Sequence, residues 1–295
     1  MAQSMTGFGR SEKVFDSRRY SIEIKSVNSR FCDINIRMPK LFNFADTNIR
    51  KLISDTLVRG KVDVFISFED DSDEACEVVV NSSLVKAYSD AITDISKITG
   101  RADDANAARL AVFPDVLLTR QKIVDENVIG EELEQTLKEA LDGIREMRSA
   151  EGLNLVSDLI DKINSLEKVK AEIEDRAPSV VEEYKVRLSD RIEELLADNN
   201  KAFYDEARIT AEVAVFADKC AIDEELKRLG SHFSQGKRIL AVDDSVGKKM
   251  DFLIQEINRE TNTIGSKAND LEITNRVLVM KNIVEEMREQ IQNLV

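Results

Sequence analysis

Residues 246–265 read VGKKMDFLIQEINRETNTIG, and this stretch decides how the end of the chain folds. Its apolar side chains recur at helical spacing and form one stripe, made of Met250, Leu253, Ile254, Ile257 and Ile264. The other positions carry Lys, Asp, Gln, Glu, Asn and Arg, which offer hydrogen-bond donors, acceptors and metal ligands. We therefore predict a helix that packs along one side and presents a polar site on another. The alternative is a solvated, salt-bridged face without a binding role.

A second amphipathic helix follows, and the two together predict a helical hairpin. Gly265 stands where a left-handed residue would end the first helix, and Asn269 with Glu272 has the spacing of a capping box. The inward positions of the second helix are Ile273, Val277, Val284, Met287 and Ile291. The hairpin is expected to pack along one edge and to leave its polar side open.

The length and composition of the chain favour a globular protein with more than one domain. It has 295 residues, of which 42% are hydrophobic and 33% charged. No apolar run approaches the length that spans a membrane, and residues 1–12 lack the apolar centre of a signal peptide. The three cysteines lie far apart and match no zinc or redox spacing, which indicates structural thiols in the reducing cytoplasm.

The net charge of −14 is unevenly distributed and argues against a protein that coats nucleic acid indiscriminately. Residues 1–61 carry 12 Lys and Arg against 6 Asp and Glu, whereas residues 62–225 carry 19 against 40. Residues 226–295 are close to neutral, with 11 against 10. Because exposed charges are screened beyond about 10 Å, the more basic ends can still hold a polyanion locally. The alternative is charge segregation without function.

The first 80 residues show the alternation of a sheet with one buried face. Apolar side chains alternate with polar ones in residues 20–24, 34–38 and 62–68, and a short strand is expected at 77–80. A helix between the second and third of these begins at Asp46 and ends at Arg59-Gly60, with inward positions Ile49, Leu52, Ile53 and Leu57. These patterns predict an antiparallel or mixed sheet covered by that helix.

Helical spacing dominates from residue 81 onward and leads first to Gly100. Long charged helices are then expected at 131–176, 179–199 and 204–232. Pro178 and Asn199-Asn200 are expected to separate them. A helix as long as the first of these needs another long helix or another subunit to cover its apolar stripe, which favours a homo-oligomer.

The fold class that follows is α+β, with an N-terminal antiparallel or mixed β-sheet domain and its covering helices, then long helices and a C-terminal helical hairpin. We divide the chain into an α+β domain at 1–130, a connecting and oligomerisation region at 131–203, and a helical domain at 204–295 that carries the polar site. No internal repeat or low-complexity tract alters this division.

His232 is the only histidine of the chain and follows a run of carboxylates. Glu225, Arg228 and His232 share one helix face, so an imidazole and a hard oxygen are available to Mg²⁺ or Mn²⁺, or for general base catalysis. Glu256 and Glu260 lie one helical turn apart and repel one another, and a shared cation would relieve that repulsion. The alternative for a lone histidine is a packing or capping role.

Two turns in the N-terminal half place basic side chains beside the backbone. Arg30 lies between two predicted strands, and Arg59 and Lys61 flank a glycine where the predicted helix meets a strand. Each arrangement suits a phosphate contact, although ordinary turn chemistry accounts for both. Nucleotide-cradling, serine-hydrolase, metalloprotease, kinase and Cys/His signatures do not occur, which leaves carboxylate- or metal-assisted chemistry, or binding without chemistry.

Several segments of the chain form one recognisable set. They are SMTGFG at 4–9, SVNSRF at 26–31, RGKV at 59–62, EG at 151–152, IDEELxRLxxH at 222–232, GKKxDFxxQExNRExNT at 247–263 and REQIQN at 288–293. With this set the chain resembles, from end to end, the YicC/YloC-like family of bacterial proteins, described as stress-induced and as endoribonucleases. The segment at 247–263 is long and unusual, which makes the resemblance specific.

The resemblance implies an endoribonuclease, a hydrolase that cleaves single-stranded or small regulatory RNA in the cytoplasm. It also implies dependence on a divalent metal, Mn²⁺ or Mg²⁺, and a ring-like homo-oligomer, with a hexamer favoured, that acts beside other RNA-decay enzymes. On the family pattern the metal and catalytic candidates are Glu225, His232, Glu256 and Glu260. The candidates for the RNA backbone are Arg228, Lys248, Lys249, Arg259 and Lys267, with Arg30, Arg59 and Lys61 as outer contacts.

Two other functions compete with this interpretation. An RNA-binding adaptor or scaffold that modulates another ribonuclease would use the tail hairpin for binding alone. A purely structural oligomer is disfavoured because it gives the polar helix at 246–265 no role. Cleavage of RNA by purified protein, with and without EDTA, separates the enzyme from the adaptor.

Overall fold

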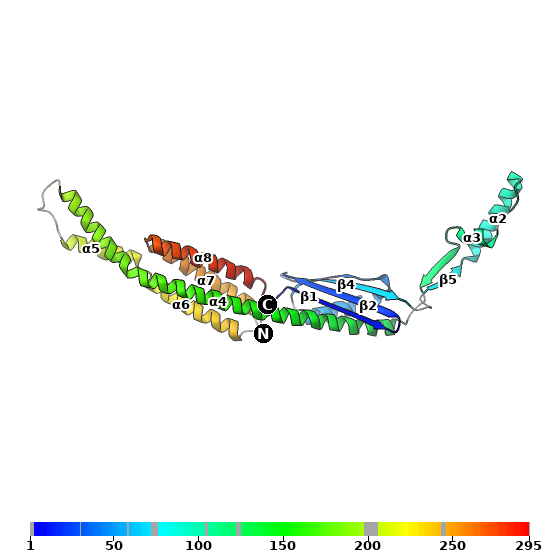
Figure 1. Cartoon of the computed structure of the whole chain (residues 1–295), viewed down its shortest axis with the longest axis horizontal. Coiled ribbons are helices and arrows are strands. Elements are labelled where there is room, and N and C mark those ends of the chain that lie inside the picture. The colour runs from blue at the N-terminus through cyan, green and yellow to red at the C-terminus, as the bar shows by residue number, and fades with distance from the viewer. Residues whose placement is uncertain are drawn as a thin grey trace.

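Helix α4, Glu126–Ala197, runs through most of the molecule and joins two packed halves (Figure 1). The N-terminal sheet packs on its first part, and the helices of the C-terminal half pack on its second part. The structure is a computed structural model, and it describes residues 3–29, 31–57, 59–71, 76–103, 106–121, 125–197, 206–242 and 246–294. The chain as a whole forms a long, gently curved body.

The N-terminal half is built on a four-stranded sheet with the strand order β1-β2-β4-β3. Its strands are β1 at Gly7–Phe15, β2 at Arg18–Val27, β3 at Cys32–Arg37 and β4 at Gly60–Asp70. Neighbouring strands are antiparallel except β3 and β4, which run parallel because a helical crossover connects them. The predicted mixed sheet is confirmed. Strand β1 was not predicted from the sequence. Its buried positions are Gly9 and Ser11, so it shows no alternation of apolar and polar side chains.

One face of this sheet is buried, as the alternation predicts. Tyr20, Ile22 and Ile24 of β2 belong to a core that is closed by the start of α4, by α1 at Asp46–Thr56 and by the short 3₁₀ helix η1 at Lys40–Ala45. Strand β1 lies close against α4, and a Cβ at Gly9 would be 2.2 Å from the carbonyl oxygen of Ala140. Glycine is therefore required there for the sheet to reach the helix.

An arm projects from the outer end of this half (Figure 1). It contains the antiparallel strands β5 at Cys76–Val80 and β6 at Leu117–Gln121, and the helices α2 at Ser82–Thr99 and α3 at Ala107–Val112. Asn81 caps α2 by accepting from the backbone N–H of Leu84, and Gly100 ends the helix in the left-handed region. Ile98 and Val112 are 83% and 84% exposed, so the arm presents apolar side chains to solvent.

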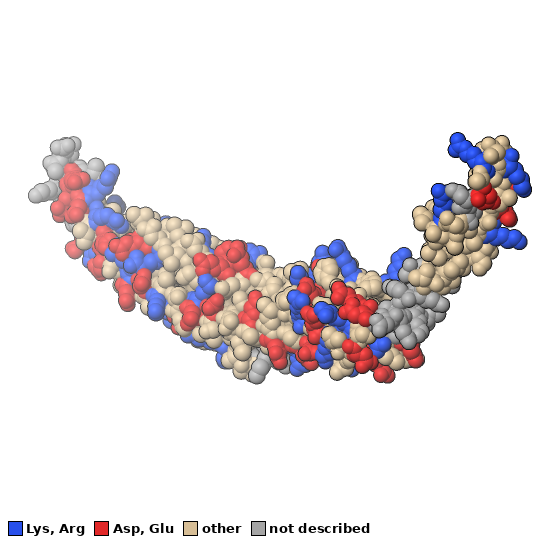
Figure 2. All heavy atoms as spheres, turned by 45° about the vertical axis from the view of Figure 1, so that its right-hand side comes forward, with Lys and Arg blue, Asp and Glu red and all other residues tan. Residues whose placement is uncertain are grey.

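In the C-terminal half, three helices pack against the second part of α4: α5 at Glu206–Cys220, α6 at Asp223–Val242 and α8 at Leu271–Ile291. Helix α7 at Val246–Lys267 packs against α6 and α8. The apolar stripes of α7 and α8 are buried, so the predicted hairpin is confirmed. No helix in the described ranges has the length and apolar character that crossing a membrane requires. On the face shown in Figure 2, acidic and basic side chains lie in small mixed groups along the body.

Pro178 does not interrupt α4, and the predicted break at this residue is wrong. A proline inside a helix removes a backbone hydrogen bond and usually kinks or ends the helix. Here Ile173 and Val180, on either side of the proline, are both buried in the C-terminal core, and this packing outweighs the missing hydrogen bond. Helix α4 also begins at Glu126, so our division at residue 130 falls inside it.

The predicted helix at 204–232 is also wrong, because the structure contains two helices, α5 and α6, separated at Ala221-Ile222. The first turn of α6 carries Asp223, Glu224 and Glu225, and acidic side chains favour a helix N-terminus through the helix dipole. The sequence therefore contained this signal. The predicted break at residues 199–200 lies outside the described part of the chain.

The turn between α7 and α8 differs from its prediction in two details. Helix α7 continues through Gly265, where a Cβ would be 3.0 Å from Val277 Cγ1, so this glycine permits close packing of α7 on α8. The left-handed residue of the turn is Asn269, with φ of 45°. The cap of α8 is Asp270, whose carboxylate accepts from the backbone N–H of Ile273 at 2.9 Å.

Candidate metal centre and RNA-binding surface

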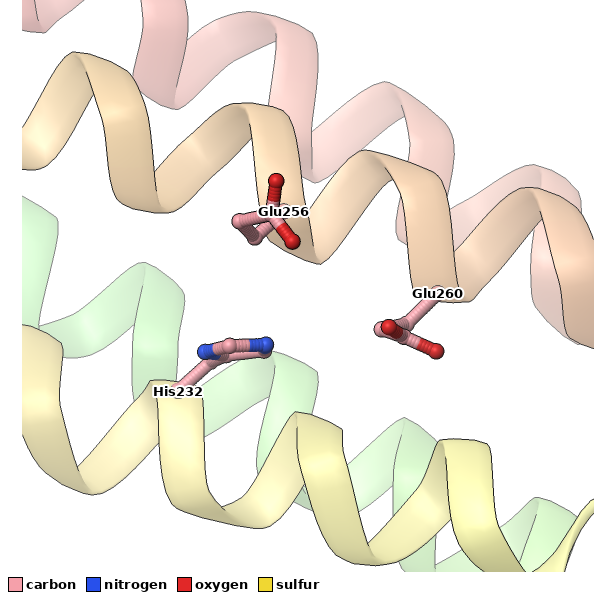
Figure 3. Close-up of side chains that lie close together, drawn as sticks. All are labelled: His232, Glu256 and Glu260. Atoms are coloured by element: carbon pink, nitrogen blue, oxygen red, sulfur yellow. The ribbon is translucent and has the colours of Figure 1, made fainter.

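The two helices α6 and α7 bring three candidate metal ligands together. His232 lies ten residues before the end of α6, and Glu256 lies ten residues after the start of α7. Two helices that turn back on one another place such residues at the same level, and Glu260 follows one helical turn further along α7. The ligand atoms of His232, Glu256 and Glu260 all lie within 4.8 Å of one another. Figure 3 shows the three side chains pointing into the space between α6 and α7.

The donors of this group fit a divalent cation. Glu260 is only 4% exposed, although a buried carboxylate is unfavourable unless a cation or several hydrogen bonds accompany it. The buried Nδ1 of His232 has no hydrogen-bond partner among the described residues. An unpartnered imidazole nitrogen beside two carboxylates is a ligand set that Mn²⁺ accepts, and the carboxylates alone suit Mg²⁺. The predicted convergence of His232, Glu256 and Glu260 is therefore present in the structure.

Two arginines lie beside these carboxylates. The Nη1 of Arg228 is 3.5 Å from Glu260, and its Nη2 is 2.5 Å from the exposed carboxylate of Glu224. These two carboxylates, Glu224 first, raise the pKa of Arg228, so it stays protonated. The Nη1 of Arg259 is 3.7 Å from Glu256. Arg228 and Arg259, two of the four arginines predicted to contact RNA, thus border the group and give its rim positive charge.

The structure separates Glu225 from this group. Its carboxylate accepts from the Nζ of Lys267 at 2.6 Å and is 6% exposed. Burial alone would raise the pKa of Glu225, but the hydrogen bond and charge of Lys267, together with Arg228, bring it below its usual value. Glu225 and Lys267 therefore form a partly buried ion pair between α6 and the end of α7.

Lys248 and Arg59 line a common hollow of about 470 Å³ between the sheet and the tail hairpin, together with Met5, Asn28, Gly247, Asp251, Gln255, Arg288, Ile291, Gln292 and Leu294. The tail is fixed to the sheet here, because the Nδ2 of Asn28 donates to the carbonyl of Gln292 at 2.8 Å. The backbone N–H of Met5 donates to the carbonyl of Asn293, also at 2.8 Å. Segments that are far apart in the sequence thus meet at one polar surface.

The remaining predicted RNA contacts that the structure describes do not line this hollow. Lys61 is exposed at the start of β4, opposite Asp33 in the register with β3. Arg30 lies outside the described residues. Lys249 is exposed on α7. It lines a second hollow together with Lys248 and Phe252.

Phe252 was absent from the residues predicted to act on RNA. It is 65% exposed and lies one helical turn before Glu256 on the polar side of α7. A large aromatic side chain at a polar position of residues 246–265 was the signal that could have singled it out.

Known protein families match the chain along most of its length. Residues 2–157 match the family described as "Endoribonuclease YicC-like, N-terminal region", and residues 173–295 match "Endoribonuclease YicC-like, C-terminal". The chain is 42% identical over 294 residues to a protein of Clostridioides difficile named "Probable endoribonuclease YicC". It is 29% identical over 294 residues to a protein of the same name from Haemophilus influenzae, and both matches span the full length of both proteins. The chain therefore belongs to the YicC-like endoribonuclease family.

Proposed function

We propose that this protein is a metal-dependent endoribonuclease that cleaves single-stranded or small regulatory RNA. The proposal rests on one observation, the meeting of His232, Glu256 and Glu260 in the groove between α6 and α7. Family membership supplies RNA as the substrate class, since two full-length relatives are named probable endoribonucleases. Mn²⁺ or Mg²⁺ is the proposed cofactor.

A cation held by these three side chains would polarise a phosphodiester and lower the pKa of a bound nucleophile. The nucleophile is water or the ribose 2′-OH, whose oxygen bonds to phosphorus while the P–O bond to the leaving ribose oxygen breaks. We assign Glu260 to holding the cation, because it is buried, and Glu256 to accepting the proton of the nucleophile, because it is more exposed. Arg228 and Arg259 supply positive charge where negative charge develops on the phosphate oxygens.

We assign Glu225 and Lys267 a structural role in this scheme, although both were candidates for the site. Lys267 already neutralises the charge of Glu225 through Oε1, and Glu225 is not among the three side chains whose ligand atoms meet. Lys248 and Arg59 are proposed to hold the RNA backbone in the hollow between sheet and hairpin.

We also propose that the protein works as a homo-oligomer in the cytoplasm, with a hexamer favoured, beside other RNA-decay enzymes. The arm supports an oligomer, because no described residue of α2 is buried although the helix carries apolar side chains. Exposed apolar side chains gathered on one projecting element are typical of protein interfaces. Light scattering that gives the mass of a monomer at micromolar concentration would contradict this part of the proposal.

The experiment that tests the enzyme is cleavage of a fluorescent single-stranded RNA by highly purified protein. Activity should vanish with EDTA and return with Mn²⁺. It should also vanish in a Glu256→Gln, Glu260→Gln double variant, while the exposed Glu134→Gln, which lies on α4 in the N-terminal half, serves as a matched control. Undiminished activity in the double variant would identify a contaminant or a wrong site.

An RNA-binding adaptor is the second candidate, and one observation favours it. Arg228 and Arg259 already lie within 4 Å of Glu260 and Glu256, an arrangement that balances the carboxylates without any metal. An adaptor would bind RNA equally well with and without EDTA and would leave it intact. The same cleavage assay, run beside a binding assay, therefore separates the two functions.

A further inference from the structure

A second hollow opens between α6 and α7, next to the metal group. It has a volume of about 480 Å³ and is lined by Gln235, Ile239, Lys248, Lys249 and Phe252. Phe252 is 65% exposed, and both lysines are exposed as well. Neither the metal group nor the Glu225–Lys267 pair explains why an aromatic side chain should face solvent at this place.

Helical spacing places this hollow directly beside the candidate catalytic residues. On α7, Phe252, Glu256 and Glu260 follow one another at intervals of four residues and share one side of the helix. On α6, His232, Gln235 and Ile239 share one side in the same way. One helical turn is about 5.4 Å, so the aromatic ring lies a single turn from Glu256 along the same groove.

The chemistry of the lining points to single-stranded nucleic acid. An exposed ring offers a face on which a base can stack, and neighbouring lysines attract the phosphates on either side of that base. In the described part of the chain, Lys248 makes no ion pair that would occupy its charge. Two cations on the rim of this hollow are notable in a chain with a net charge of −14, because they favour a negatively charged occupant.

We propose that Phe252 is a base-stacking platform that holds one nucleotide of the substrate strand beside the metal group, with Lys248 and Lys249 contacting the flanking phosphates. This inference rests on the proposed function for its substrate class. It names the residue that would give the proposed preference for unpaired RNA, because a base can stack on Phe252 only after it has left a duplex. A protein partner fits less well, since lysine is depleted at the centre of protein interfaces.

The test measures RNA binding without cleavage, by fluorescence anisotropy in EDTA with a single-stranded RNA. Phe252→Ala should weaken binding about 5- to 150-fold, the range that corresponds to removing one stacked base. Phe252→Tyr and Phe252→Trp should keep most of the affinity, because they restore an aromatic face. Leu278→Ala, which removes a comparably exposed apolar side chain from α8, should bind as the wild type does.

The lysines give an independent readout. A Lys248→Gln, Lys249→Gln variant should reduce the slope of log affinity against log salt by about 0.7 for each phosphate that the lysines no longer neutralise. The slope of Phe252→Ala should stay at the wild-type value, because stacking releases no counterions. A blunt-ended duplex RNA should bind Phe252→Ala and wild type alike.

Unchanged binding of single-stranded RNA by Phe252→Ala would overturn the proposal. A lower molecular mass of this variant in light scattering, with RNA binding intact, would also overturn it and assign Phe252 to a subunit contact. Wild-type protein that binds RNA through Phe252 but cleaves nothing with Mn²⁺ would support the platform and refute the enzyme. The two proposals therefore fail in distinguishable ways.

Discussion

Glu225 and Glu260 are two buried carboxylates of the same bundle, yet their surroundings differ. Glu225 accepts a 2.6 Å hydrogen bond from Lys267 and is 6% exposed. Glu260 is 4% exposed, and the nearest cation in its ion pairs is Arg228 at 3.5 Å, a side chain that Glu224 also holds. The other neighbours of Glu260 are His232 and a second carboxylate, Glu256.

We propose that this difference separates a carboxylate that stabilises the fold from one that takes part in the chemistry. A buried acid needs a cation, and the fold provides one for Glu225 within hydrogen-bond distance. At Glu260 the fold instead brings a second acid and an imidazole nitrogen, which are the ligands of the metal site that we propose. Burial alone would have given the two residues the same interpretation, and only their partners distinguish them.

The largest expected effect comes from exchanging the two acids for their amides. Glu260→Gln should lower the rate of RNA cleavage roughly 100-fold or more, because it removes a ligand of a cation that contributes several kcal/mol to the reaction. Glu225→Gln should leave the rate within a few-fold of the wild type. Single-turnover cleavage with Mn²⁺ measures both variants. Equal losses in the two would erase the distinction drawn between them.

Metal binding should raise the free energy of unfolding through the proposed ligands and not through Glu225. At a Mn²⁺ concentration one hundred times the dissociation constant, the unfolding free energy should rise by about 2.7 kcal/mol, since only the folded chain presents the three ligands together. Urea titrations followed by circular dichroism measure this gain. We expect the gain in the wild type and in Glu225→Gln, and its loss in His232→Asn. A gain that survives in His232→Asn would place the metal elsewhere.

Much of this arrangement could be predicted from the sequence, because it depends on helical spacing. The apolar stripes of the tail fixed which sides of α7 and α8 are buried, and that left Glu256 and Glu260 on a polar side. The position of His232 opposite them depends on the packing of α6 against α7, which no local pattern predicted. The sheet followed from strict alternation in residues 20–24 and 62–68, which the structure buries on one face.

The remaining features depend on contacts that no local pattern contains. Lys267 is 42 residues from Glu225 in the sequence, so their pairing depends on the packing of α6 against the end of α7. The passage of α4 through Pro178 depends on burial of Ile173 and Val180 by other helices. Strand β1 was missed because glycine and serine occupy its inward positions, where Gly9 allows contact with α4.

Removal of Lys267 should leave the buried carboxylate of Glu225 without its ion-pair partner. Lys267→Met leaves the carboxylate of Glu225 buried without its cation, and this should lower the unfolding free energy by about 1–3 kcal/mol. A Lys267→Met, Glu225→Met double variant should recover most of that loss, because no charge is then left unpaired. Lys138→Met, which breaks an exposed pair with Glu134, is the control and should cost under about 0.5 kcal/mol. An equal loss in the single and double variants would show that Lys267 acts through its packing instead.

The smallest expected effect is the dependence of stability on pH. The folded-state pKa of Glu225 lies below its unfolded value of about 4.3, because Lys267 and Arg228 outweigh the effect of burial. The stability that the pair contributes is therefore fully present above that pH and is lost as the pH falls through the folded pKa. Glu225→Gln removes the titrating group, so its unfolding free energy should decline less steeply below about pH 4.3 than that of the wild type. Urea unfolding between pH 3 and pH 6 measures the two curves, and parallel curves would mean that Lys267 does not bind the ionised form of Glu225 preferentially.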